Sequence, residues 1–141
     1  MSSATPLLKV RNVSVDYVTD FGNARAVNNV SLDIMPGETL GLAGESGCGK
    51  STLAFAISNL HGAPALISEG EILFDDRDVL AMSPEELRRF RWNEASMVFQ
   101  SAMNALNPVI TIGAQIVDVI LAHKNVSMDE AWSRGEELLE T

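Results

Sequence analysis

The residues best suited to chemistry lie in the stretch GESGCGKST, residues 44–52. Gly44, Gly49, Lys50 and Ser51 match the spacing G-x-x-x-x-G-K-[ST] of a phosphate-binding loop. Glycines let the backbone fold tightly and bring its N–H groups close to phosphate oxygens. The amine of Lys50 can reach the β- and γ-phosphates of a nucleotide, and the hydroxyl of Ser51 can ligate Mg²⁺. The sequence therefore predicts a site for ATP and Mg²⁺.

The other members of this loop are expected to surround the same ligand: Glu45, Ser46, Gly47, Cys48 and Thr52. Cys48 is the only cysteine, which excludes an intrachain disulfide and fits a reducing compartment. Its thiol is either simply tolerated in the loop or activated by the amides of the helix that follows. In the second case, alkylation of Cys48 blocks nucleotide binding.

The segments around the loop follow the order strand, loop, helix. Partial alternation of apolar residues predicts strands over 7–18 and 26–34, joined by a turn over 20–25. The apolar run 39–43 predicts a short strand that enters the loop, and helical spacing predicts a helix over 51–60. This is the context that a phosphate-binding loop requires.

The rest of the chain continues to alternate between strands and helices. Residues 69–80 are typical of a strand, a turn and a second extended piece, and residues 96–100 of a short buried strand. Helices are predicted where helical spacing or a Ser-x-x-Glu capping box occurs: 83–92, 111–124 and the end of the chain after Ser127. This order indicates an α/β fold class.

Composition limits the possible partners. The chain has 141 residues, of which 46% are hydrophobic and 21% charged, as in an average globular domain. Its net charge of −9 disfavours nucleic acid, because phosphate backbones need surfaces rich in Lys and Arg. The N-terminus does not resemble a secretory signal, and no apolar stretch approaches the length of a membrane span. We therefore expect a soluble protein of the cytoplasm.

Several runs resemble one family. SLDIMPGETLGLAGESGCGKST (31–52) is similar to the start of an ATP-binding subunit of an ABC transporter, and GEILFDDRDV (70–79) is similar to the hairpin that precedes its helical region. MVFQSAMNALNPVITIGAQI (97–116) resembles the Q-loop of the dipeptide/oligopeptide permease branch. The resemblance covers essentially the whole chain, and its Q-loop portion is fairly specific to that branch.

The resemblance implies a fold and a domain organisation. The expected fold is the N-terminal part of a P-loop NTPase of the ABC type, with an antiparallel β subdomain and the start of a RecA-like core. Residues 1–100 would form this part of the nucleotide-binding core, and residues 101–141 the Q-loop and the beginning of the helical subdomain. The family's later signature and Walker B motifs do not occur in the sequence. We therefore expect a longer subunit, of which this stretch alone binds ATP weakly and hydrolyses almost none.

The resemblance also implies roles for residues outside the phosphate loop. Tyr17 occupies the position of the aromatic residue that stacks on adenine, with Phe21 as a rival. Gln100 would contact Mg²⁺ and the attacking water, so the expected catalytic residues are Lys50 and Gln100. The branch usually has Asp-Pro where Ser101-Ala102 stands, which leaves details of the Q-loop open, and Ser where Cys48 stands.

By the same resemblance, the function is to energise peptide import by binding and hydrolysing ATP. The implied partners are a second ATP-binding subunit, identical or different, and transmembrane permease subunits, with the protein peripheral on the inner face of the cell membrane. The branch also handles nickel and sugars. Two alternatives stay open: a small P-loop kinase, and a short nucleotide-binding module without catalysis.

Overall fold

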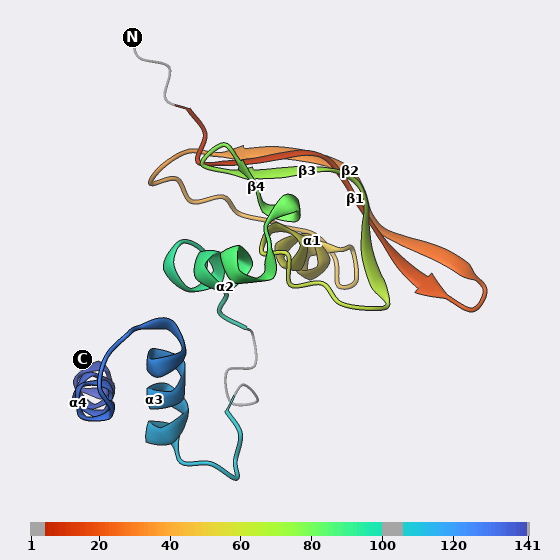
Figure 1. Ribbon diagram of the computed structural model, residues 1–141. Helices are drawn as coiled ribbons and strands as arrows, with labels where there is room; N and C mark the ends of the chain where they lie inside the picture. The colour runs from red at the N-terminus through yellow and green to blue at the C-terminus, as the bar shows by residue number, and fades with distance from the viewer. Residues whose placement is uncertain (1–4, 100–105, 141) are drawn as a thin grey trace. The chain divides into compact units, whose positions relative to one another are not determined.

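The computed structural model describes residues 5–99 and 106–140 (Figure 1). The chain forms two compact units, Met1–Arg91 and Trp92–Thr141, which we call the N-terminal and C-terminal units. Each unit has its own core.

The N-terminal unit contains a four-stranded sheet. Its strands are β1 (Leu8–Thr19), β2 (Gly22–Ile34), β3 (Ala65–Phe74) and β4 (Arg77–Asp78). They are ordered β2-β1-β3-β4, and every neighbouring pair is antiparallel. The sheet confirms the antiparallel β subdomain. The turn expected over 20–25 is wrong, because the β1–β2 ladder continues to Thr19 opposite Gly22 and leaves only residues 20–21 as the turn.

The three long strands bend at one place, where each has a residue in the left-handed region. Asn12 in β1 (φ 52°) and Asn29 in β2 (φ 53°) are joined by a 2.8 Å hydrogen bond from Asn12 Nδ2 to Asn29 Oδ1. Gly70 in β3 (φ 93°) lies where the β1–β3 register shifts. Asparagine tolerates this backbone region and glycine adopts it freely. These residue types therefore allow the sheet to bend.

One ion-pair network links these strands close to Tyr17. Arg25 of β2 donates two hydrogen bonds to the buried carboxylate of Asp16 in β1, from Nε (2.9 Å) and Nη2 (3.1 Å). It also pairs with Glu69 of β3 at 3.5 Å. The Arg25 hydrogen bonds hold the pKa of Asp16 below its usual value. The network helps to fix the register of β1, which carries Tyr17, against its neighbouring strands.

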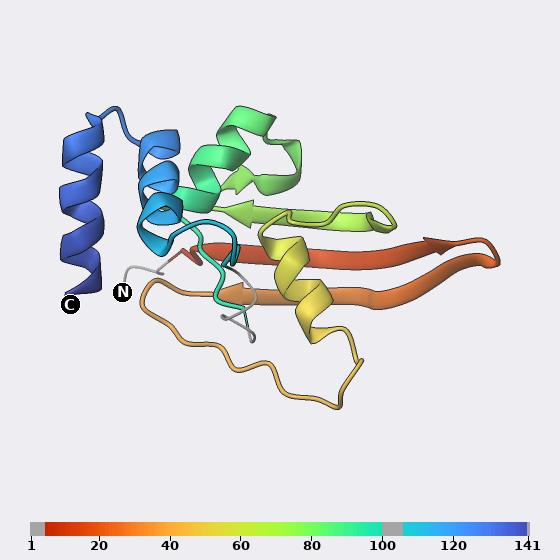
Figure 2. The same ribbon diagram turned by 90° about the horizontal axis from the view of Figure 1, so that it is seen from below.

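Helix α1 (Lys50–Ile57) covers one face of the sheet, as Figure 2 shows. Leu53 and Ala56 are its buried residues, and they join a core made of Leu8, Val10, Val13, Val15, Val27, Ile72, Val79 and Phe90. The helix is shorter than the expected 51–60. It ends at Ile57 because Asn59 adopts the left-handed region (φ 48°).

Two further elements close the N-terminal unit: the 3₁₀ helix η1 (Val79–Ala81) and the helix α2 (Pro84–Asn93). The expected capping box is present, since Glu86 N–H donates to Ser83 Oγ and Ser83 N–H donates to Glu86 Oε2. Phe90 is buried and meets Phe74 edge to face, with ring centroids 5.2 Å apart. These contacts hold α2 against the sheet.

The C-terminal unit contains two helices that pack against each other, α3 (Ile112–His123) and α4 (Met128–Leu139). The second capping box, between Ser127 and Glu130, is also confirmed. Val117, Ile120 and Ala131 form the buried cluster between the helices. Within the described ranges, no helix is both long and apolar enough to span a membrane.

Two predicted strands are absent from the described residues. Residues 39–43 and 96–99 carry no strand, and Leu40, Leu42, Val98 and Phe99 are exposed rather than buried. An apolar run becomes a strand only when another strand pairs with it, and no described strand lies beside either run. Local sequence therefore overpredicts strands here.

Replacing Gly70 with alanine is expected to lower the free energy of unfolding by at least about 1 kcal/mol, because alanine is strained in the left-handed region. A Cβ there would also lie 2.5 Å from the carbonyl oxygen of Arg11. Urea unfolding measures the change. Gly62→Ala is the matched control, since a Cβ at Gly62 meets nothing within 4 Å. Equal stability of the two variants would contradict this account of the bend.

Candidate functional site

The phosphate loop runs close against β2. Gly47 (φ 79°) and Gly49 (φ 93°) are in the left-handed region, and Gly49 is the N-cap of α1. A Cβ at Gly49 would lie only 2.4 Å from the carbonyl oxygen of Ala26 in β2. The glycine is therefore required for the chain to turn into α1 while it touches the sheet.

Lys50 is held by the loop that precedes it. Its Nζ donates to the carbonyl oxygens of Gly44 (2.8 Å) and Glu45 (2.6 Å) and lies 3.4 Å from Cys48 Sγ. An ammonium group has three donors, and a thiol is a weak acceptor. Two donors thus fix the amine above the loop, and the third faces a partner that a phosphate oxygen can readily replace.

The loop also closes on itself. Cys48 is exposed, and its Sγ would lie 2.7 Å from a Cβ at Gly44. The two positions therefore nearly touch across the loop. A side chain at Gly44 would collide with the Cys48 thiol and come within 3.9 Å of Lys50 Nζ, so this loop, which we call the cradle, closes tightly only because Gly44 has no side chain.

The first turn of α1 supplies the donors for an anion. The first N–H groups of an α-helix have no carbonyl partner within the helix, and the helix dipole places partial positive charge at the same end. Lys50, Ser51 and Thr52 form this turn. Ser51 is exposed, so its hydroxyl can reach a metal ion carried by a bound phosphate.

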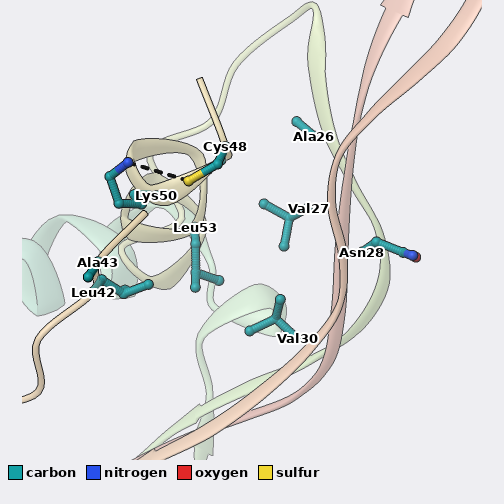
Figure 3. Close-up of a pocket in the computed structure, with 10 residues that line it drawn as sticks. Ala26, Val27, Asn28, Val30, Leu42, Ala43, Cys48, Lys50 and Leu53 are labelled. Atoms are coloured by element: carbon teal, nitrogen blue, oxygen red, sulfur yellow. Dashed lines mark hydrogen bonds between the residues drawn. The ribbon is translucent and has the colours of Figure 1, made fainter. Parts of the chain in front are cut away.

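A cavity of about 360 Å³ lies beside the loop, between α1 and β2. In Figure 3, Val27 of β2 and Leu53 of α1 face this space, whereas Asn28 points away from it. The lining is mostly apolar, with Val30, Leu42 and Ala43 among its other members. Phosphate binding needs N–H donors. Cys48, Gly49 and Lys50 also line this cavity. We therefore assign the phosphate site to the donors of the loop and the helix N-terminus, and not to the apolar part of the lining.

The structure brings Tyr17 to the helix of the phosphate loop. Its hydroxyl lies 3.4 Å from Thr52 Oγ1. Phe21, the rival for the same role, sits at the tip of the β1–β2 turn with its side chain fully exposed. Of the two aromatic residues, Tyr17 is thus the one whose side chain contacts α1.

The remaining sequence-predicted residues divide into two groups. Glu45, Ser46 and Gly47 lie in the exposed part of the loop. Gln100 lies outside the described residues, together with Ser101-Ala102. The sequence does not reveal the close approach of Ala26 to Gly49 or the contact of His61 with α1. Both are tertiary contacts between separate segments of the chain, and no local sequence pattern predicts them.

Comparison with known proteins places this geometry in a family. A family model described as ABC transporter matches residues 27–140. The dipeptide transport ATP-binding protein DppD of Lactococcus lactis is 41% identical over 135 residues, which are 95% of this chain and 39% of that protein. The oligopeptide transport ATP-binding protein OppD of Escherichia coli is 39% identical over 97% of this chain and 40% of its own length. The chain thus spans about two fifths of these relatives.

Solved structures give the same result for the fold. A post-hydrolysis dimer of the ATP-binding cassette MJ0796, bound to ADP and phosphate, superposes with a TM-score of 0.78 at 28% identity. The match covers 94% of this chain and 56% of that one. The phosphate loop, the antiparallel subdomain and these matches agree, and this chain belongs to the ABC transporter family.

Proposed function

We propose that this chain is part of an ATP-binding subunit that energises peptide import. The observation that carries the proposal is the Lys50 amine, held by two loop carbonyls at the N-terminus of α1. Family membership supports a transporter over a small P-loop kinase. The peptide cargo rests on the relatives named for dipeptide and oligopeptide transport.

Each site residue then has a task. The cradle between Gly44 and Gly49 closes tightly because neither residue carries a Cβ, and its backbone N–H groups bind the phosphates. Lys50 binds the β- and γ-phosphates, and Ser51 ligates Mg²⁺ that arrives with the nucleotide. Tyr17, rather than Phe21, stacks on adenine. Gln100 contacts Mg²⁺ and the attacking water.

Hydrolysis belongs to the whole subunit in this proposal. Phosphoryl transfer needs an oriented water, a metal and groups that stabilise charge, and residues 1–141 hold only some of them. Two ATP-binding subunits would sandwich the nucleotide and act on transmembrane permease subunits from the cytoplasmic face. Residues 1–100 would contribute the nucleotide-binding core, and residues 101–141 the Q-loop and the start of the helical subdomain.

The direct test reconstitutes the intact subunit with its permease subunits in proteoliposomes. We expect ATP-dependent uptake of a labelled dipeptide or oligopeptide. Lys50→Ala should lower both ATP hydrolysis and uptake by at least about 100-fold, because it removes a charge that stabilises the transferred phosphate.

Lys9→Ala is the matched control, since Lys9 forms a surface pair with Asp76 in the same unit. Undiminished hydrolysis in Lys50→Ala would contradict the assigned site. Hydrolysis without uptake of any peptide would refute peptide as the transported substrate and would leave the ATPase activity supported. Turnover by residues 1–141 alone, above that of their own Lys50→Ala variant, would refute the claim that hydrolysis needs the whole subunit.

Cys48 provides a chemical probe of the same site. Its exposed Sγ lies 3.4 Å from Lys50 Nζ. A maleimide adduct would therefore occupy the space above the cradle, and we expect Mg-ATP to slow alkylation and the adduct to block ATP binding. The rate of labelling at Cys48 is followed by mass spectrometry, with Cys48→Ser as the unlabelled control. Equal rates with and without Mg-ATP would count against a phosphate site next to this thiol.

A further inference from the structure

His61 contacts the helix of the phosphate loop from the segment that follows it. Its Nε2 lies 2.9 Å from the carbonyl oxygen of Thr52. A carbonyl oxygen only accepts, so Nε2 must carry the hydrogen and donate it. The half-buried imidazole also meets the Phe55 ring edge to face, with centroids 6.1 Å apart. The imidazole ring and its Nε2 donor therefore both contact α1, on the same side of the helix.

Thr52 is therefore contacted twice, through different groups. His61 binds its backbone carbonyl, and the hydroxyl of Tyr17 lies 3.4 Å from its side-chain oxygen. Thr52 also follows Ser51, the last residue of the loop motif, directly. This residue links the phosphate-binding turn of α1 to the aromatic residue on β1.

We propose that His61 is a positioning residue for nucleotide binding, which sets the distance between the Tyr17 ring and the phosphate loop. The inference rests on the proposed function, in which one nucleotide spans both groups. A bound ATP gains from both contacts only if their spacing is already correct, because a preorganised site avoids the cost of ordering it on binding. His61 preorganises the site because it fixes the turn of α1 that Tyr17 contacts.

The contact does not depend on the charge of the ring. The neutral tautomer with hydrogen on Nε2 and the protonated imidazolium both donate from Nε2. A neutral donor at a similar reach should therefore replace it. Glutamine has an amide nitrogen near the position of Nε2, whereas phenylalanine keeps the ring beside Phe55 and has no donor. These two substitutions separate the hydrogen bond from the ring packing.

The experiment measures the dissociation constants of Mg-ATP and of inorganic triphosphate with Mg²⁺ for the intact subunit. His61→Phe should weaken Mg-ATP binding by roughly 3- to 10-fold, as expected for one lost hydrogen bond. It should leave inorganic triphosphate nearly unchanged, because that ligand does not reach Tyr17. His61→Gln should restore most of the Mg-ATP affinity.

Tyr17→Phe supplies an independent arm, since it removes the hydroxyl that lies against Thr52 and keeps the ring. In the double variant, the fold-loss of Mg-ATP affinity should be smaller than the product of the two single losses, because both substitutions disrupt the same connection through Thr52. The positioning role would be overturned if His61→Phe weakened the binding of Mg-ATP and of triphosphate equally. It would also be overturned if the two single losses of Mg-ATP affinity multiplied in the double variant. Failure of the unaltered subunit to bind Mg-ATP would instead overturn the proposed function, and this inference with it.

Discussion

The candidate site depends on how the chain holds one ammonium group. Lys50 Nζ donates to the carbonyl oxygens of Gly44 and Glu45, so the loop itself fixes the charge that a phosphate would meet. The geometry requires a tight loop, and the left-handed Gly47 and Gly49 provide it. A lysine with free rotation would lose more conformational entropy on binding. Two loop carbonyls therefore prepare the amine before any ligand arrives.

The antiparallel sheet is part of this arrangement and not only a support for it. Gly49 lies against the carbonyl of Ala26 in β2, and Thr52 lies against the hydroxyl of Tyr17 in β1. The start of α1 is thus fixed by two different strands. The bend at Asn12 and the pairing of Asp16 with Arg25 set the course of these strands. Sheet and loop together hold the residues that we propose bind the nucleotide.

Features with local causes could be predicted from the sequence. The two capping boxes, the strands of the β subdomain and the loop-to-helix turn each follow from residues near one another, and the structure has them. Local sequence could not decide whether 39–43 and 96–100 form strands, because a strand needs a partner strand from elsewhere in the chain. The end of α1 depends on the backbone of Asn59, and the His61 contact joins residues nine positions apart. Spacing alone reveals neither.

We propose that the loop presents the third donor of Lys50 to a phosphate. The most direct measurement is an experimental structure of the intact subunit with Mg²⁺ and a non-hydrolysable ATP analogue. We expect Lys50 Nζ to keep its hydrogen bonds to the carbonyl oxygens of Gly44 and Glu45 and to lie about 3 Å from a β- or γ-phosphate oxygen. A bound analogue whose phosphates lie away from Lys50, or a Lys50 turned out of the loop, would contradict it.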